Sequence, residues 1–346
     1  MRKSFLLIAW IMFLITIISC QTKEQKKIDS TSEGISQIEP IINEVVFNEM
    51  SQAYGFKVGQ DYSLEVISNK YPSLEPQIQI ANLKFEKSFE SSLLTIDSIL
   101  SSKGKEWAKI KSQIKDQIKA SVNLNNYNSN QMKDFILTVE KRASGEIPPP
   151  IIGTLLSFNP KYLKNPTVEF TDGFKYRFSS KGNEKAKGVD FHFDLPQSFL
   201  AKDANRPNII QKFVSQNGHG LAMIMTLVLM LPEVSNVSDE DIKELAQGDE
   251  IKDMLPKGSQ FINGGFIKID NLPGLYQEYK LPQVLLDNEL LMHTINYTVY
   301  YKDKMISIQC SVGSNKEDEK NTDSVFMKYK ELFKLIAGSL VVQSQW

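Results

Sequence analysis

Cysteine is scarce in this chain: its 346 residues include only Cys20 and Cys310. If Cys20 is used for another purpose, Cys310 has no partner within the chain, which excludes a disulfide framework. The stability of the fold must then come from the burial of apolar side chains, and a chain of this length can supply enough of it.

The chain also has no excess of positively charged residues over negatively charged ones. The net charge is −1, and removal of the first 19 residues, which include Arg2 and Lys3, leaves 38 basic against 41 acidic residues. Nucleic-acid binding requires a clustered positive field, so no nucleic acid is expected as a partner. A hydrophobic content of 41% and a charged content of 23% are typical of soluble globular proteins, and the length suggests about two domains.

The common catalytic signatures are absent. The sequence contains no H-E-x-x-H, no G-x-S-x-G and no Walker A motif, and the lysines and glycines of "KGNEKAKG" have the wrong spacing for a phosphate loop. No cofactor is therefore expected, and the sequence favours a non-enzymatic protein.

The N-terminus has the order of a secretory signal peptide over residues 1–19. Arg2 and Lys3 precede an uncharged apolar stretch of 14 residues, Phe5 to Ile18, and small Ser19 precedes Cys20. The stretch is short for a membrane span, which needs about 20 apolar residues. The quartet "IISC" at 17–20 resembles the lipobox of bacterial lipoproteins. The resemblance implies cleavage before Cys20, a diacylglyceryl group on its thiol, and usually an acyl group on its new amine.

Residues 20–38 are expected to be the lipidated cysteine followed by a flexible tether. The segment is rich in Lys, Gln, Ser, Thr and Glu and is too poor in apolar residues to fold. Two or more acyl chains hold a protein firmly to a membrane. Resemblance to enterobacterial lipoproteins, where Asp after the cysteine favours inner-membrane retention, implies that Gln21 favours the outer membrane if the cell has one.

Residues 39–150 show helical periodicity and predict a small antiparallel helical bundle. Gly104 separates a first apolar stripe from a second one that begins at Trp107. The run Pro148-Pro149-Pro150 predicts a stiff polyproline segment that ends this region. The two stripes consist of Leu74, Ile78, Leu83, Phe89, Leu93, Ile96 and Leu100, and of Trp107, Ile110, Ile114 and Ile118. Met132, Phe135, Val139 and Ala143 predict a third helix.

Residues 151–346 change to strand periodicity, with helices expected from Ser238 toward Leu255 and over 322–342. Apolar residues alternate with polar ones over 189–195, Asn217-Gly218 predicts a type I′ hairpin, and "LAMIMTLVLML" at 221–231 predicts a central strand. Gly264-Gly265 predicts a bulge. Further strands are expected at 260–269, 274–281, 290–301 and 305–312. The fold class is therefore α+β, a helical region followed by an antiparallel sheet packed with helices.

The second half resembles the PsbP-like fold, an αβα sandwich found in envelope lipoproteins of the DcrB type. The resemblance rests on "GVDFHFDLPQSF", "LPGLYQEYK" and "YTVYYKDKMISIQCSVG", with the final helix "FMKYKELFKLIAGSL". It covers about half of the chain and consists of strand and helix patterns.

Asp190, His192 and Asp194 form the candidate site, because they share one face of a predicted strand. Such a trio could hold a metal ion or another ligand, or could be the solvated face of a half-covered strand. His293 is expected to be a packing or surface residue, and Cys310 a small buried apolar one. Tyr297 and Tyr301 share one strand face and Tyr300 the other, as expected for packing.

The leading expectation is a membrane-anchored envelope lipoprotein that acts as a non-catalytic binding or accessory protein. Its lipid contacts the membrane, and its globular body binds an unidentified protein or envelope component. One alternative is a metal-dependent or hydrolytic envelope enzyme that uses His192 with Asp190 and Asp194. The other is a lipid or small-molecule carrier with a cavity between the terminal helix and the sheet.

Overall fold

A computed structural model describes residues 42–122, 128–231, 237–285 and 288–346. These residues belong to two compact units. The helical unit comprises Glu39–Lys175 with Pro196–Leu200, and the sheet unit comprises Tyr176–Leu195 with Ala201–Trp346. Cys20 and the predicted signal peptide and tether lie outside the described residues. Within the described residues, no helix is both long and apolar enough to cross a membrane.

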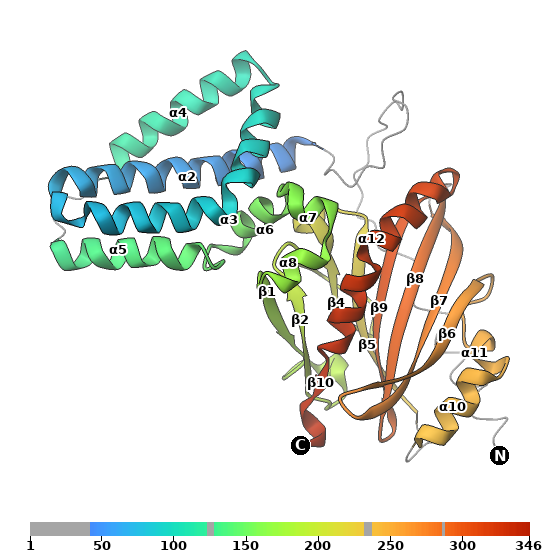
Figure 1. Cartoon of the computed structure of the whole chain (residues 1–346). Helices are drawn as coiled ribbons and strands as arrows, with labels where there is room; N and C mark the ends of the chain where they lie inside the picture. The colour runs from blue at the N-terminus through green and yellow to red at the C-terminus, as the bar shows by residue number, and fades with distance from the viewer. Residues whose placement is uncertain (1–41, 123–127, 232–236, 286–287) are drawn as a thin grey trace. The chain divides into compact units, whose positions relative to one another are not determined.

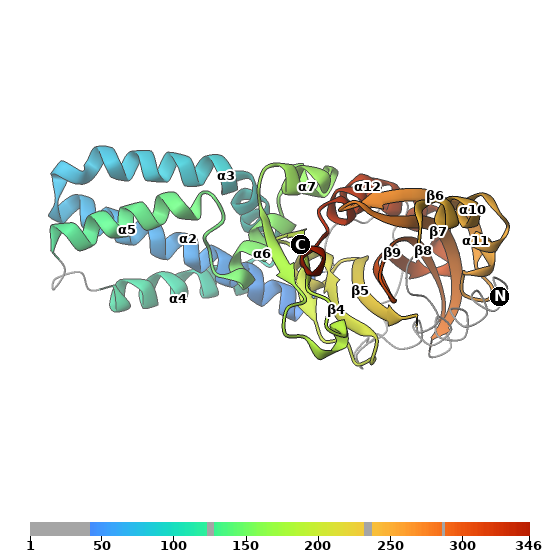
Figure 2. The ribbon, with the colours of Figure 1, turned by 90° about the horizontal axis from the view of Figure 1, so that it is seen from below.

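The helical unit is built from long helices that lie side by side, followed by short ones (Figures 1 and 2). Asn43 caps the first of them, because its side-chain oxygen accepts a hydrogen bond from the Val46 backbone at 2.9 Å. Gly104 has a φ of +59° and separates the second helix from the third, as its place in the sequence predicts. The helices are α2 (Glu44–Lys70), α3 (Glu75–Ser101), α4 (Lys105–Ser121), α5 (Ser129–Arg142), α6 (Pro149–Ser157), α7 (Pro160–Lys164) and α8 (Thr167–Thr171).

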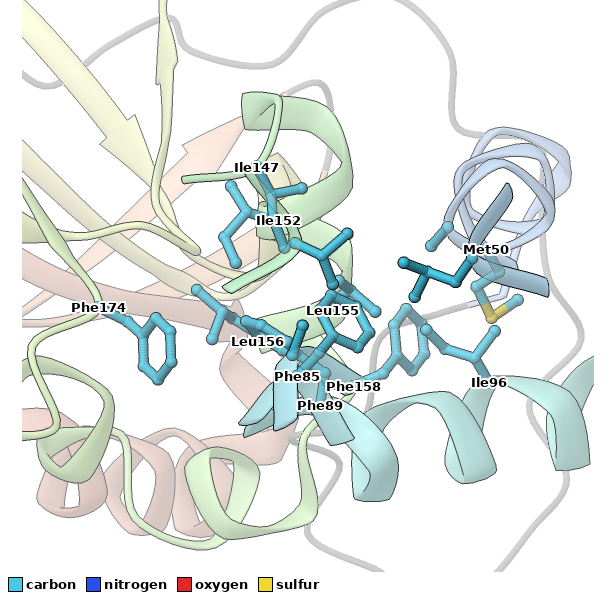
Figure 3. Packing of buried hydrophobic residues seen from close by; sticks show 14 of the residues in the cluster. Met50, Phe85, Phe89, Ile96, Ile147, Ile152, Leu155, Leu156, Phe158 and Phe174 are labelled. Atoms are coloured by element: carbon cyan, nitrogen blue, oxygen red, sulfur yellow. The ribbon is translucent and has the colours of Figure 1, made fainter. Parts of the chain in front are cut away.

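Aromatic and aliphatic side chains form the core of the helical unit (Figure 3). Met50 of α2, Phe85 and Phe89 of α3, and Leu155 of α6 are fully buried, and the two phenyl rings are 5.2 Å apart. Full burial of each such side chain contributes about 1.5–3 kcal/mol. The burial of these side chains therefore holds α2, α3 and α6 together, although they are far apart in the sequence.

Two details of the predicted bundle are corrected. Pro148–Pro150 do not form a polyproline segment, because Pro149 and Pro150 occupy the first turn of α6. Proline fits this place, since its φ is helical and the first turn does not need its missing N–H. Leu83, predicted in the apolar stripe of α3, is 65% exposed. The stripe of α4 is confirmed, with Trp107 buried and its ring 5.1 Å from that of Tyr54.

A seven-stranded sheet in the order β3-β4-β5-β9-β8-β7-β6 dominates the sheet unit, beside a three-stranded sheet in the order β1-β2-β10. In the larger sheet, β4 pairs with β5, β5 with β9, β9 with β8, β8 with β7 and β7 with β6, and all these pairs are antiparallel. The pair of β2 and β10 in the smaller sheet is also antiparallel. The strands are β1 (Lys175–Ser179), β2 (Phe191–Pro196), β3 (Leu200–Lys202), β4 (Ile209–Val214), β5 (Ala222–Met230), β6 (Gln260–Ile269), β7 (Leu272–Leu285), β8 (Asn288–Tyr301), β9 (Lys304–Asn315) and β10 (Val341–Val342).

The terminal helix α12 (Glu319–Gly338) lies across one face of this sheet, over β8 and β9 (Figure 1). Helices α10 (Asp239–Gln247) and α11 (Glu250–Asp253) lie near β6 and β7. Ser238 caps α10 through a capping box with Asp241, as the sequence predicts, but the helix expected to continue to Leu255 breaks after Gln247. Gly248 there adopts an extended conformation.

The predicted α+β class, with a helical region followed by antiparallel sheets, is confirmed. The central strand expected in "LAMIMTLVLML" is β5, which is buried along most of its length. The hairpin between β4 and β5 exists, but its connection is a distorted turn over 215–218 in place of a two-residue turn. Gln216 as well as Asn217 and Gly218 has a positive φ. The bulge predicted at Gly264-Gly265 is not there, because both glycines pair in regular register with β7. The irregularity of β6 lies between Phe261 and Asn263.

Candidate functional site

The candidate trio lies on or beside β2, whose other face is buried through Phe191 and Phe193. Asp190, His192 and Asp194 are half-buried, as the alternation predicts. Asp194 forms an ion pair with Arg177 of β1, with Oδ1 3.0 Å from Nε. Across the described part of the chain, no group of three or more His, Cys, Asp or Glu residues could hold a metal ion. The metal or ligand role of this trio stays a prediction without support from the geometry.

Other residues considered in the sequence are packing residues. Cys310 lies in β9, is fully buried, and has a thiol whose pKa is raised by burial. Tyr297, Tyr300 and Tyr301 are all buried. The carrier hypothesis places a cavity between α12 and the sheet. Fully buried side chains of α12 fill this interface, among them Phe326 and Phe333.

A cluster of charged side chains lies between α12 and the sheet, and we call it the ionic cluster. Its centre is His293 of β8, which is 5% exposed. The ring Nδ1 is 2.8 Å from Asp323 Oδ1 of α12, and Nε2 is 3.1 Å from Glu278 Oε1 of β7. The ionic cluster consists of Glu278, Lys280, His293, Glu319, Asp323 and Lys330.

Two lysines complete the ionic cluster. Lys330 Nζ donates to Glu278 Oε2 at 2.7 Å, and Lys280 Nζ donates to Asp323 at 2.6 Å and to Glu319 at 2.8 Å. Burial raises the pKa of Glu278, but hydrogen bonds from His293 and Lys330 outweigh it, so that this pKa is lowered overall. The groups compensate one another and fasten α12 to the sheet. Glu278 and His293 are buried, whereas Glu319, Asp323 and Lys330 reach the solvent at the edge of the helix.

The opposite face of the same sheet carries a row of neutral polar side chains at its centre, which we call the polar strip. Three cross-strand pairs join β8 to β9: Thr294 with Ser311, Asn296 with Gln309, and Thr298 with Ser307. Gln277 of β7 lies opposite Asn296 on its other side. The polar strip consists of Gln277, Thr294, Asn296, Thr298, Ser307, Gln309 and Ser311, each at most 4% exposed.

The two faces of β9 differ in amino-acid composition, one being apolar and the other polar. Ile306, Ile308, Cys310 and Val312 face α12, whereas the residues between them, 307, 309 and 311, belong to the polar strip. A sheet face that packs against a helix is normally apolar, since buried polar groups must find hydrogen-bond partners. The polar strip therefore differs in kind from the face that α12 covers.

Hydroxyl groups within the polar strip bond to each other. Thr294 Oγ1 is 3.0 Å from Ser311 Oγ, and Thr298 Oγ1 is 2.9 Å from Ser307 Oγ. Asn296 donates from Nδ2 to Thr298 Oγ1 at 3.1 Å, but its Oδ1 has no hydrogen-bond partner among the described residues. A buried amide oxygen without a partner is uncommon in folded proteins. It is one of several such atoms among the described residues, with Thr226 Oγ1 of β5 among the others.

Apolar side chains border the polar strip. Met223, Met225 and Leu227 of β5 lie opposite Ser311, Gln309 and Ser307 in the antiparallel register. Tyr279 of β7 lies opposite Thr294. On the side of β7, Gln277 Nε2 donates to the Ile251 carbonyl of α11 at 2.8 Å. The polar strip thus consists of neutral donors and acceptors between apolar margins. Its side chains are buried, and it contains no group for acid–base chemistry.

No protein-family profile matches the sequence, and a search of curated proteins finds no match. No family is assigned. Among solved structures, the Saccharomyces cerevisiae Ran-binding protein Mog1p is 9% identical, with 49% of this chain and 95% of that chain covered and a TM-score of 0.32. LpqN of Mycobacterium tuberculosis, involved in cell envelope biogenesis, is 10% identical, with 50% and 93% covered and a TM-score of 0.30. A Bacteroides thetaiotaomicron protein is 11% identical, with 44% and 45% covered and a TM-score of 0.27.

These similarities are too low to bear on the function of the chain. The PsbP-like resemblance therefore stays an interpretation of sequence patterns.

The helical unit contains one buried carboxylate of note. Glu169 of α8 is 3% exposed and accepts hydrogen bonds from Ser198 N at 2.8 Å and from Ser198 Oγ at 2.7 Å. Burial raises the pKa of Glu169 to about 7, although the bonds from Ser198 and Gln197 act in the opposite direction. The arrangement joins α8 to the segment 196–200 within one unit, and its carboxylate titrates near neutral pH.

Proposed function

We propose that the chain is a lipid-anchored envelope protein whose sheet unit binds a neutral, polyhydroxylated molecule on the polar strip. The anchor is the acylated Cys20 expected from the lipobox. The binding site is the polar strip on the face of the sheet opposite α12. Its side chains are at most 4% exposed, so binding requires this face to open. In this proposal the protein binds its ligand without chemical change.

The unpartnered Oδ1 of Asn296 is the observation that carries the binding proposal. A buried amide oxygen without a partner costs about 1–3 kcal/mol, and a ligand hydroxyl that donates to it recovers part of that cost. The neighbouring residues on β8 and β9 place further hydroxyl and amide groups at the regular spacing of the sheet.

The neutrality of the polar strip indicates the ligand class. No charged side chain belongs to it, so it offers no counter-charge to a phosphate or carboxylate. A sugar ring presents hydroxyl groups around its edge and C–H groups on its faces. The hydroxyl groups match Asn296, Gln309 and their neighbours, and the C–H groups match the apolar margin at Met223 and Met225. A neutral glycan therefore fits both parts of the surface.

Isothermal titration calorimetry tests this proposal with the mature lipidated chain in detergent and the neutral oligosaccharides maltohexaose, cellohexaose and chitohexaose. We expect saturable binding of at least one of them. Asn296→Leu should weaken that binding by about tenfold or more, because about 1.4 kcal/mol corresponds to a factor of ten.

Gln260→Leu is the matched control, since Gln260 is an exposed residue of β6 in the same sheet. This variant should bind within about twofold of the wild type. Saturable binding to none of the three sugars, or equal binding by Asn296→Leu and the wild type, would overturn the proposal.

A further inference from the structure

We propose that a proton on His293 controls how firmly the N-terminal half of α12 holds to the sheet, so that this half of the helix loosens when the proton is lost. The ionic cluster lies on the face opposite the polar strip, so the inference is independent of ligand binding. It concerns a conformational device in the sheet unit.

The hydrogen bonds of His293 require two protons on its ring. Nδ1 faces Asp323 Oδ1 and Nε2 faces Glu278 Oε1, at 2.8 and 3.1 Å. An ionised carboxylate only accepts hydrogen bonds, so both ring nitrogens must donate, and the ring is then an imidazolium. A neutral ring leaves one nitrogen lone pair directed at a carboxylate oxygen.

The charges around His293 balance only in this state. Glu278 and Lys280 face it from β7, and Glu319, Asp323 and Lys330 face it from α12. On β9 the residue opposite His293 is the uncharged Val312. Three carboxylates thus meet two lysines and one histidine. Loss of the proton leaves one uncompensated negative charge. Asp323 and Glu319 are 38% and 54% exposed, so the cost falls mainly on Glu278, whose side chain is 4% exposed beside His293.

A ring contact adds to the same effect. The imidazole of His293 and the phenyl ring of Phe326 are parallel within 6°, with centroids 3.6 Å apart. A cation over an aromatic face is attracted to it, and this attraction is lost when the ring becomes neutral. Both the ion pairs and the stack therefore weaken together.

The effect is confined to one half of α12. The groups bonded or stacked to His293 on this helix are Asp323 and Phe326, in its first half. Leu332, Phe333 and Ile336 in its second half are fully buried apolar residues, and their packing does not depend on pH. In the first half, the buried Val325 and Phe326 lie beside the ionic cluster and share its interface. Deprotonation should thus loosen residues 319–330 while the rest of the helix stays in place.

Hydrogen–deuterium exchange of the mature full chain between pH 5 and pH 9, corrected for intrinsic exchange, tests the inference. We expect the protection of residues 319–330 to fall about tenfold or more relative to that of β5 as the pH rises. His293→Gln should abolish this pH dependence, since glutamine does not titrate. His192→Gln, on half-exposed β2, is the control and should keep it.

Histidine ring carbon NMR of the wild-type chain supplies a second readout if His293→Gln does not fold. His192→Gln and His219→Gln assign the signals of the three histidines. We expect the His293 ring to carry two protons at pH 5 and to lose one over the same pH range in which residues 319–330 lose protection. A ring that is neutral at pH 5, or that loses its proton without any change in protection, would overturn the inference. An unaltered pH dependence in folded His293→Gln would do the same.

Discussion

The phenyl ring of Phe326 stacks on the imidazole ring of His293 at a centroid distance of 3.6 Å. This contact joins α12 to β8 in the centre of a packed interface, where Phe326 is fully buried. The imidazole ring and Glu278 lie beneath the helix, and Asp323 of the helix pairs with the ring, so that apolar packing and ion pairing act on the same element.

Phe326→Ala should lower the free energy of unfolding of the sheet unit by about 3–5 kcal/mol, because it removes a fully buried aromatic side chain and leaves a cavity. Urea denaturation followed by circular dichroism measures this change. Met327→Ala is the control on the same helix, since Met327 is 59% exposed and its loss should cost less than about 0.5 kcal/mol. Equal stability of the two variants would contradict the assigned packing of α12.

Glu169→Gln should change the pH dependence of the stability of the helical unit. The pKa of Glu169 is raised from 4.5 to about 7 in the folded chain, so its contribution is fully present below pH 4.5 and is lost as the pH rises through 7. Relative to Glu169→Gln, the wild type should therefore lose stability, on the order of 2 kcal/mol, between pH 5 and pH 8.

Trp107 fluorescence during urea denaturation can report this change, in a Trp346→Phe background that removes the other tryptophan of the mature chain. Trp346 is 82% exposed, so this background should be benign. A constant stability difference between the wild type and Glu169→Gln over this pH range would show that Glu169 does not titrate there.

Gly274→Ala and Gly338→Ala should have opposite effects on the sheet unit. A Cβ at Gly274 in β7 meets the backbone carbonyl oxygen of Thr298 in β8, which cannot move without breaking the sheet. At Gly338, the last residue of α12, it meets nothing within 4 Å, and alanine there should stabilise by about 0.4–1 kcal/mol. Thermal unfolding of the two variants compares them, and a tolerated Gly274→Ala would contradict the register of β7 and β8.

Cys20→Ala should abolish both signal-peptide cleavage and acylation, if the lipobox is functional. The intact mass of the purified variant should show that Met1 is retained and that no acyl group is added. The membrane fraction should then contain no mature lipidated form of the variant. Cys310→Ala is the matched control, because Cys310 is buried in β9 and should not affect processing. If the purified wild type and Cys20→Ala differ in mass only by the side-chain substitution, the lipid anchor is refuted.

Local periodicity was enough to predict most elements of the sheet unit. β6 occupies the expected residues 260–269, and β2 shows the alternation of Phe191, Phe193 and Leu195 with polar neighbours. The sequence does not decide the conformation of the prolines at 148–150, because the same residues suit both a polyproline segment and the first turn of a helix. Which of the two forms depends on the apolar residues that follow and on the core they join.

The two sites of the sheet unit depend on contacts between distant residues. The position of His293 in a strand between Met292 and Thr294 predicts only a packing or surface residue. Its partners Glu278 and Asp323 are 15 and 30 residues away in the sequence, so local sequence does not reveal them. Ser307, Gln309 and Ser311 alternate visibly with apolar residues, but only the register with Thr294, Asn296 and Thr298 joins them into one polar strip. A one-residue change of register would have placed these side chains on opposite faces.

Methyl NMR of the mature lipidated chain during titration with the oligosaccharide that binds tests the location of the ligand most directly. We expect the methyl signals of Met223, Met225, Thr294 and Thr298 to shift with saturation, while those of Ile306, Ile308 and Val312 on the α12 face stay in place. Shifts confined to the α12 face or to the helical unit, with those of the polar strip unchanged, would contradict the proposed binding surface.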